Sequence, residues 1–442
     1  MTKHKITFAQ RCKRILNIAI PSGLNSLLDI ANIMIGIFMM GKLSSYHINA
    51  VGLGLNFFML IFVITNVFFV GTNAQISRLY GKKDFNAIID VLSSMFFGAI
   101  AFSLPIYLIA NLLYPSYFSW IGVDTTSQAL GGIFVNIILF GIPALLAKSI
   151  LISSFAAMGN TKTPFFIKIV ITTINIALNY ILIFGIFFEP LDIVGMAISN
   201  LLTSYLELVI LLALLAKKNG RLKLRFFFSP AIFKKGINIG IPVGVERGFT
   251  IISLILISKF IATYGSDYLA GFQIGTRIEA FAVMPSFGFM VASMALTGQY
   301  LGKNRKDLLK QFIYTIIILG SIFMGVMGLF MMIFGEALSY PFSNKNDVVY
   351  SSMMYLFFIG LSQIPLVFIF VLDGAYRGAG ATKISLIINI TSIWGLRILP
   401  MYLCLIAGLP IFSIYIIILI ETFIRGFIFF YVFKKYFDRI FI

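Results

Sequence analysis

The stretch ILNIAIPSGLNSLLDIANIMIGIFMM, residues 15–40, decides the fold class of this chain. It contains no Lys or Arg and exceeds the roughly 20 apolar residues that a helix needs to cross a bilayer. A short basic leader precedes it, but the apolar run is too long for a signal peptide, so we predict a retained first helix. Similar stretches fill most of the remaining chain. We therefore predict an all-α integral membrane protein.

The composition supports the same fold class. Of the 442 residues, 60% are hydrophobic and 11% are charged, and the mean hydropathy is +0.99. A soluble domain could not cover its surface with so few charges. We predict about twelve transmembrane helices by length and hydropathy. The predicted spans are 15–40, 48–76, 89–112, 129–154, 164–187, 194–216, 237–262, 269–297, 311–334, 350–375, 384–407 and 411–433.

The charges predict the orientation. Lys and Arg total 34 against 16 Asp and Glu, which gives a net charge of +18. Basic residues gather at both ends and in alternate loops, including 78–83, 217–235 and 303–310, whereas 113–128 and 187–193 contain none. Under the positive-inside rule, both termini lie in the cytoplasm. We predict a multi-pass protein of the bacterial inner membrane, and the charge gives no reason to expect nucleic acid as a partner.

An internal repeat relates the two halves. Shifting the chain by half its length aligns three motifs at corresponding loops or helix starts. They are Ile20-Pro21-x-Gly23 with Ile241-Pro242-x-Gly244, Gly81-Lys82 with Gly302-Lys303, and Gly159-x-Thr161-Lys162 with Gly380-x-Thr382-Lys383. Six helices per half is an even number, so we predict two parallel six-helix repeats. The predicted domains are an N-lobe at 1–216, a basic cytoplasmic linker at 217–236 and a C-lobe at 237–442.

Asp29 is the clearest candidate for chemistry. It lies in the middle of the first span, where no Lys or Arg occurs from Ile15 to Gly41. A carboxyl group in hydrocarbon is costly, so it usually faces a cavity or a partner. Asp29 could exchange a proton or hold a cation there. The alternative is a structural carboxyl bonded to a neighbouring helix.

Three amides and a second carboxyl join Asp29 as candidates. Asn175 and Asn179 lie one turn apart in the fifth predicted span, with Asn200 in the sixth as a weaker member of the group. Their amide oxygens suit either cation coordination or hydrogen bonding between helices. Glu246 corresponds to Asn25 under the repeat and is a possible C-lobe acidic site.

Other ionisable residues of the spans point to structural pairs. Asp373 and Arg377 have the i, i+4 spacing of a helix-surface ion pair. Arg277 with Glu279, and Glu421 with Arg425, also suggest internal pairing. Arg397 has no assigned partner.

Catalytic and metal-binding motifs are absent from the sequence. The chain has two histidines and two cysteines without metal-site spacing, and no phosphate-binding Gly-Lys-Ser/Thr loop. We expect no enzyme activity, no cofactor and no resident metal. A Na⁺ ion at Asp29, Asn175 and Asn179 stays an option.

Two groups of motifs resemble those of the multidrug and toxic compound extrusion (MATE) transporters of the MOP flippase superfamily. The matching stretches are GNTKTP at 159–164 with Asn175 and NYILIFG at 179–185, and YRGAG at 376–380 with Trp394, Arg397 and Pro400. The Ile-Pro starts of the first and seventh helices fit too, so the resemblance covers essentially the whole chain. It implies a V-shaped pair of six-helix lobes. It also implies that Asp29 is the first-helix carboxylate of ion coupling, and that Asn175 and Asn179 are the fifth-helix polar pair.

The chain departs from the family pattern at several positions. Members with an N-lobe ion site usually carry Asp where this chain has Asn179, so one ionisable group is missing. The tenth-helix acid of another branch aligns with Leu366. The Asp of the family's Gly-Asp-Thr-Lys loop is replaced by Asn160 in one half and Ala381 in the other.

Two transport functions follow from the resemblance. The first is secondary active efflux of organic, often cationic and amphipathic, compounds in exchange for H⁺ or Na⁺ by alternating access, with Asp29 as the main ion-coupling carboxylate. The alternative is a flippase for a lipid-linked sugar or another amphipathic lipid, which would need a cavity rich in Arg or Lys. Either protein would act as a monomer, with small organic molecules and the lipid bilayer as its partners.

Overall fold

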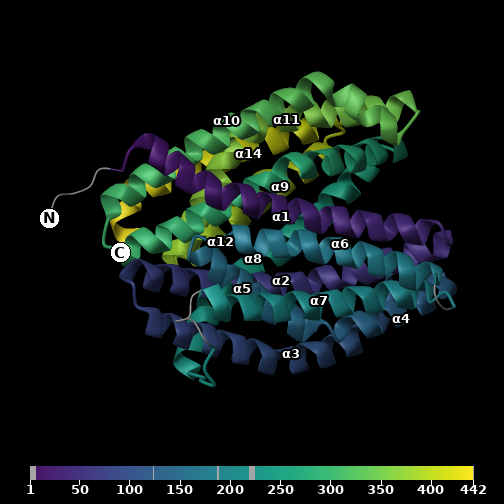
Figure 1. Cartoon of the computed structure of the whole chain (residues 1–442). Helices are drawn as coiled ribbons and strands as arrows, with labels where there is room; N and C mark the ends of the chain where they lie inside the picture. The colour runs from purple at the N-terminus through teal and green to yellow at the C-terminus, as the bar shows by residue number, and fades with distance from the viewer. Residues whose placement is uncertain (1–5, 123, 187–188, 219–223, 442) are drawn as a thin grey trace. The chain divides into compact units, whose positions relative to one another are not determined.

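The computed structural model describes residues 6–122, 124–186, 189–218 and 224–441, and these residues form long helices without a strand. The helices are labelled in Figure 1. Those of the first half are α1 Phe8–Gly41, α2 Ser45–Lys82, α3 Phe85–Ile121, α4 Thr125–Leu139, α5 Ile142–Ala157, α6 Lys162–Phe184 and α7 Asp192–Lys218. Those of the second half are α8 Pro230–Ala262, α9 Ser266–Gly302, α10 Lys306–Ser339, η1 Tyr340–Phe342, α11 Asn346–Ala379, α12 Thr382–Ile390, η2 Thr391–Ile398, α13 Leu399–Ile406 and α14 Phe412–Ile440.

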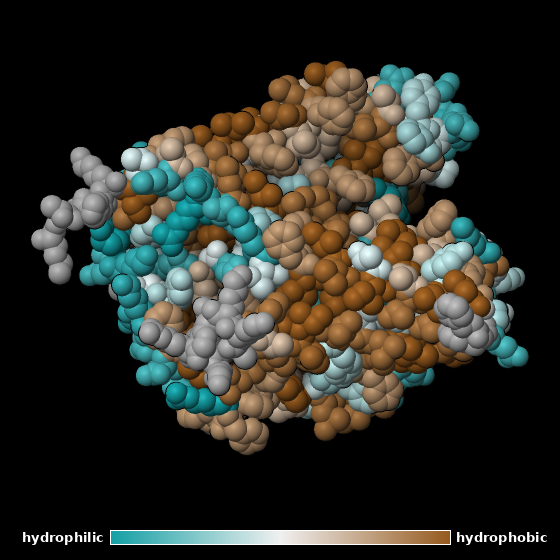
Figure 2. Space-filling model, viewed as in Figure 1, coloured by the Kyte–Doolittle hydropathy of each residue, from teal (hydrophilic) through white to brown (hydrophobic). Residues whose placement is uncertain are grey.

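The helix count confirms the predicted fold class. Within the described residues, eleven helices are long and apolar enough to cross a membrane, or twelve if the bent pair α4 and α5 forms one span. Every predicted span coincides with one of these segments. The protein is therefore an all-α, multi-pass membrane protein. Figure 2 shows hydrophobic side chains along the flanks of the helices and hydrophilic ones gathered towards helix ends.

The predicted fourth span is the one that bends. α4 and α5 meet at an angle of 52° across Phe140 and Gly141. Pro143, the second residue of α5, has no backbone N–H to donate, so it cannot continue the hydrogen-bond ladder of α4. At the other end of α4, the Asp124 carboxylate accepts a hydrogen bond from the Ser127 N–H at 2.8 Å. This bond lowers the pKa of Asp124 and caps the helix.

The predicted eleventh span is continuous but irregular. α12 passes into the π-helix η2, which passes into α13 with Pro400 in its first turn. Pro400 removes one backbone donor, and a π-turn re-registers the hydrogen bonds around it. The π-helix brings Ser392 and Arg397 to the same buried carboxylate, described below.

The contacts divide the chain into two units. Asn25–Gly240 forms the N-terminal unit, and the chain up to Leu24 joins the residues from Ile241 onward in the C-terminal unit. These limits differ from the boundaries drawn from sequence at 216 and 237. α1 and α8 are each divided between the units close to a proline within the helix, Pro21 or Pro242.

Part of the predicted linker 217–236 is helical or packed against a helix. α7 extends to Lys218, and α8 already begins at Pro230. Between them, the backbone N–H groups of Arg225 and Ser229 donate to the hydroxyls of Ser93 and Ser94 on α3. Residues 219–223 of the linker lie outside the described part of the chain.

The two divided helices make equivalent close crossings. In the N-terminal unit, a Cβ on Gly240 of α8 would lie 2.1 Å from the Val67 carbonyl oxygen of α2. In the C-terminal unit, a Cβ on Gly288 of α9 would lie 2.0 Å from the Ala19 carbonyl oxygen of α1. The half-chain shift that aligns Pro21 with Pro242 also aligns Ala19 with Gly240, and Val67 with Gly288. The crossing therefore follows the internal repeat, and a glycine on either helix permits it.

Candidate functional site

A polar seam runs between α6 and α7 in the N-terminal unit. Lys168, Thr172, Asn175 and Asn179 recur at three- and four-residue spacings, so they lie on one face of α6. The facing residues of α7 are Ser199, Asn200, Thr203 and Glu207. The pairing runs antiparallel, with amides and hydroxyls at one end of the seam and charges at the other.

Four charged side chains form the ionic end of this seam. The Lys168 ammonium lies 2.6 Å from the Asp29 carboxylate of α1 and 3.8 Å from the Glu207 carboxylate of α7. Lys148 of α5 donates to the same Glu207 carboxylate at 2.8 Å. We name these four residues the lysine network. Glu207 is 3% exposed, whereas the Asp29 side chain is 51% exposed.

The sequence offers Asp29 no cation within its own span and leaves a bond to a neighbouring helix as the alternative, and the network contains such a bond. The partner comes from another helix, α6. Lys148, Lys168 and Glu207 lie within the predicted spans 129–154, 164–187 and 194–216, and sequence reasoning missed all three. The signal was present, because ionisable residues inside spans are rare and need partners. Asp29 also needed a cation from outside its own helix.

The three predicted amides do come together. Asn175 donates to Asn200 at 3.1 Å and to the Thr203 hydroxyl at 2.9 Å, and Asn179 donates to the Asn175 oxygen at 3.0 Å. The Ser199 hydroxyl in turn donates to the Asn179 oxygen. Each of the three amide oxygens therefore accepts a hydrogen bond within the cluster. This geometry satisfies the amides and joins α6 to α7.

Two polar atoms of the helices that carry the lysine network have no hydrogen-bond partner among the described residues. They are the Thr172 hydroxyl, one turn after Lys168, and the Asn32 amide oxygen, one turn after Asp29. An unpaired buried polar atom costs about 1–3 kcal/mol, so such atoms are uncommon unless they serve a purpose. Both belong to the elements that supply the Asp29–Lys168 pair.

An arginine-centred network occupies the C-terminal unit. Arg377 of α11 donates to Asp373 at 2.9 Å and to Glu246 of α8 at 3.0 Å. All three side chains are buried. The predicted Asp373–Arg377 pair therefore forms, but it is buried and not on the helix surface as expected. One oxygen of Glu246, the possible C-lobe site, has no hydrogen-bond partner in the part of the chain that the structure describes.

A second arginine-centred network surrounds Glu421 of α14. Arg397, which had no assigned partner, donates to the Glu421 carboxylate, and Arg425 lies 3.1 Å from its other oxygen. The Ser392 hydroxyl donates to Glu421 at 2.7 Å, and the Glu421 side chain is fully buried. The predicted Glu421–Arg425 pair is thus present.

The predicted pairing of Arg277 with Glu279 is wrong. The Glu279 carboxylate accepts a hydrogen bond from the Tyr355 hydroxyl of α11 at 2.5 Å, and Arg277 is exposed. A two-residue separation places side chains on different faces of a helix, so these two could not meet.

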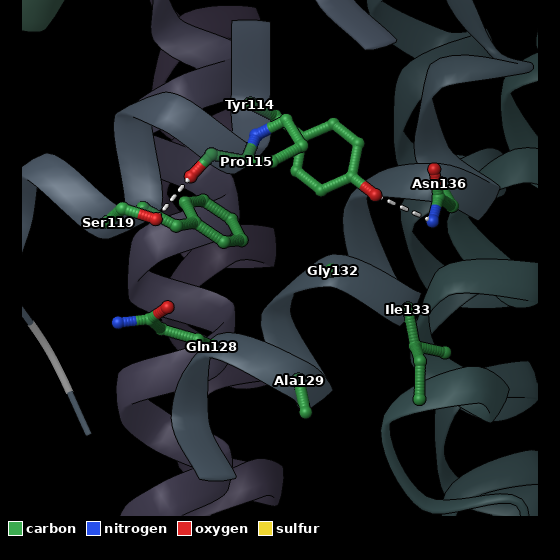
Figure 3. A pocket seen from close by; sticks show the side chains of 9 residues that line it. Tyr114, Pro115, Ser119, Gln128, Ala129, Gly132, Ile133 and Asn136 are labelled. Atoms are coloured by element: carbon green, nitrogen blue, oxygen red, sulfur yellow. Dashed lines mark hydrogen bonds between the residues drawn. The ribbon is translucent and has the colours of Figure 1, made fainter. Parts of the chain in front are cut away.

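An open cavity of about 400 Å³ lies between the end of α3 and the start of α4, and Figure 3 shows the side chains that line it. Its lining residues carry no charge, and its polar groups include the Asn136 amide, which donates to the Tyr114 hydroxyl at 3.0 Å. Among the described residues, no three His, Cys, Asp or Glu side chains gather as metal ligands. The cavity and the lysine network share no residue. The ion pairs described above therefore lie in the seam and not in the cavity.

The membrane-spanning helices, the repeat and the buried ionic networks define a polytopic helical membrane protein built from two related halves. The MatE family model matches the chain twice, at residues 21–181 and 242–403. The two matches begin at Pro21 and Pro242, which are equivalent positions of the internal repeat. Together they cover well over half of the chain. The chain belongs to the MatE family.

Curated relatives are distant but similar over most of their length. The probable multidrug resistance protein NorM of Thermotoga maritima is 24% identical over 396 residues, which cover 87% of this chain and 84% of that protein. The probable multidrug resistance protein YoeA of Bacillus subtilis is 22% identical, with 86% and 84% covered.

Solved structures support the fold. An outward-facing multidrug resistance MATE transporter of the MOP superfamily superposes with a TM-score of 0.90 at 18% identity, covering 97% of this chain and 96% of that one. A MOP superfamily transporter from Pyrococcus furiosus gives a TM-score of 0.90 at 18% identity and covers 100% and 99%. At this level of identity, the comparison establishes the architecture.

Proposed function

We propose that this chain is a secondary active multidrug efflux transporter. It exports organic, often cationic and amphipathic, compounds in exchange for H⁺ or Na⁺ by alternating access. Family membership and the two relatives described as probable multidrug resistance proteins support the class of cargo. Asp29 is the proposed ion-coupling carboxylate.

The observation that carries this proposal is the exposure of Asp29 within an ionic network. Its carboxylate is half exposed in the middle of a span, and a lysine from another helix holds it. Protonating Asp29 removes the negative charge that attracts Lys168 and so loosens α1 from α6. A local change in charge of this kind can favour one packing of helices over another.

The other predicted site residues have supporting roles in this proposal. Asn175, Asn179 and Asn200 fix α6 against α7 and so position Lys168 and Glu207 towards Asp29. Glu246 is the proposed second acidic site, because one of its buried carboxylate oxygens has no hydrogen-bond partner within the described residues.

The test uses purified protein in liposomes with an imposed pH gradient or Na⁺ gradient, and fluorescent ethidium as the organic cation. We expect Asp29→Asn to abolish gradient-driven ethidium movement. Asp267→Asn is the matched control, because Asp267 pairs with Lys345 at 2.7 Å outside the spans, and its loss should leave transport intact. Undiminished, gradient-dependent transport by Asp29→Asn would refute the role of Asp29.

The proposed location is the bacterial inner membrane, with both termini in the cytoplasm. The native Cys12 offers a direct test, because it lies near the N-terminus and forms no disulfide. In a Cys404→Ser background, a membrane-impermeant maleimide should label Cys12 in inverted vesicles and not in right-side-out cells. The opposite labelling pattern would show that the N-terminus lies outside the cytoplasm. We propose that the transporter works as a monomer in the lipid bilayer, without a cofactor or a nucleic-acid partner.

The comparisons do not favour the flippase alternative. A lipid-linked sugar carries phosphates that unpaired Arg or Lys side chains would bind. Arg377, Arg397 and Arg425 of the C-terminal unit instead pair with carboxylates, and Arg397 and Arg425 share Glu421. The two lysines of the N-terminal network are neutralised as well.

A further inference from the structure

The place that a free cation would take beside Asp29 is already filled by part of the protein. The Lys168 ammonium lies 2.6 Å from the Asp29 carboxylate, within the distance of a charge-assisted hydrogen bond. We propose that Lys168 is a tethered cation that occupies Asp29 in place of Na⁺, so that the ion exchanged at this site is a proton. This inference rests on the proposed coupling role of Asp29 and adds the choice of ion.

The charges of the lysine network balance. Asp29 and Glu207 contribute two negative charges, and Lys148 and Lys168 contribute two positive ones. Each of the four residues comes from a different helix: Asp29 from α1, Lys148 from α5, Lys168 from α6 and Glu207 from α7. Lys168 neutralises Asp29 directly, so the Asp29 carboxylate keeps no free negative charge to attract Na⁺. A Na⁺ ion at Asp29 would also be repelled by the ammonium that it had to displace.

The amide oxygens that were predicted as Na⁺ ligands are committed to other hydrogen bonds. Hard cations are bound by several carboxylate, carbonyl or amide oxygens. The oxygens of Asn175, Asn179 and Asn200 each accept a hydrogen bond within the amide cluster. Binding Na⁺ there would break these bonds as well as the Asp29–Lys168 pair.

A proton needs neither the displacement of the Lys168 ammonium nor a set of oxygen ligands. It adds to the Asp29 carboxylate, which becomes a neutral carboxylic acid, while Lys168 remains an ammonium. Lys168 can then turn towards Glu207, whose carboxylate lies 3.8 Å from the ammonium in the present arrangement. The lysine stem is flexible, so a small rotation exchanges one carboxylate for the other. Release of the proton restores the Asp29–Lys168 pair.

The test measures Na⁺ binding directly and needs no transport. The melting temperature of the purified full chain is compared at equal concentrations of NaCl and KCl, because a ligand that binds only the folded state raises the melting temperature. We expect no difference for the wild type. Lys168→Gln should gain a saturable, Na⁺-specific rise of a few degrees. The double variant Asp29→Asn/Lys168→Gln should lose that rise.

Lys148→Gln is the matched control. It removes a lysine from the same network but leaves the Asp29–Lys168 pair in place, so it should gain no response to Na⁺. Lys168→Met keeps an unbranched apolar stem and replaces Lys168→Gln if the latter does not fold.

Two results would overturn the inference. One is a Na⁺-specific stabilisation of the wild type that Asp29→Asn abolishes. The other is a folded Lys168→Gln or Lys168→Met variant with no Na⁺ response. Failure of the proposed transport function is distinguishable, because it is read from ethidium movement by Asp29→Asn and leaves these binding results unchanged.

Discussion

The ionic networks of the two units differ in their cations and in their exposure. Lysines bridge the carboxylates of the N-terminal unit, and one of these, Asp29, is half exposed. Arginines bridge those of the C-terminal unit, where Glu246, Asp373 and Glu421 are all nearly or fully buried. Lysine is a point charge on a flexible stem, whereas the planar guanidinium of arginine fixes several hydrogen bonds at once.

This difference separates an exchangeable network from a fixed one. Lys168 has a second carboxylate within reach, so its pair with Asp29 can break without leaving a buried charge alone. Arg397 and Arg425 share Glu421, so losing that carboxylate would leave both without it. We therefore expect the C-terminal networks to dominate stability and the N-terminal network to dominate ion exchange.

The largest expected effect comes from Glu421→Gln. Removing this buried charge leaves Arg397 and Arg425 uncompensated, and breaking a buried pair in this way costs about 3–5 kcal/mol. Thermal unfolding of the purified protein in detergent measures the loss. Glu336→Gln, at an exposed position of α10, is the control and should change little. Equal melting temperatures for the two variants would contradict the expectation that the C-terminal networks dominate stability.

A smaller loss is expected for Arg377→Lys. The charge is kept, but a lysine cannot hold Asp373 and Glu246 with the geometry of the guanidinium. Loss of one hydrogen bond to a charged group corresponds to about 1.5–3 kcal/mol. The converse change, Lys168→Arg, should have a smaller effect on the melting temperature. If Lys168→Arg proved the more damaging, the N-terminal network would be the more rigid one.

The helix crossings test a feature that the units share. Gly240→Ala and Gly288→Ala each place a methyl group about 2 Å from a backbone oxygen, and overpacking of this kind costs about 1–3 kcal/mol. We expect similar losses in melting temperature for both. Gly248→Ala, in the same helix as Gly240, meets nothing within 4 Å and is the control. Strongly unequal losses would show that the repeat does not preserve this contact.

The smallest effect on stability is expected for Asp29→Asn. Asp29 is the half-exposed member of its pair with Lys168, and ion pairs that reach solvent contribute about 0–1 kcal/mol. Lys168 also retains Glu207. The variant should therefore unfold close to the wild-type temperature although it loses gradient-driven transport. A large drop in melting temperature would make Asp29 a structural residue and weaken its assignment to ion coupling.

Much of the fold could be predicted from the sequence. Span positions follow from local hydropathy, because each helix satisfies its own backbone hydrogen bonds in hydrocarbon. The repeat followed from proline, glycine and lysine motifs at fixed intervals. The bend between α4 and α5 and the π-helix η2 escaped detection, because both depend on how broken hydrogen bonds are re-formed around Pro143 and Pro400.

The candidate site was predicted only in part. Asp29 and the three amides stood out individually, and the clustering of Asn175 and Asn179 followed from their spacing. Their partners did not. Lys168 pairs with a residue of the first helix, and Glu246 with Arg377, which is 131 residues away. Sequence spacing reports neighbours within one helix and says nothing about which face of another helix lies opposite.

The sequence by itself determined the membrane-spanning class, the two-fold repeat and the presence of a charged residue in the middle of the first span. These are properties of single segments, set by hydrophobicity and by the cost of charge in hydrocarbon. Only the tertiary structure decided that a lysine satisfies Asp29 and that arginines close the C-terminal networks. Ion pairing between helices depends on their packing register, and residues distant in sequence set that register together.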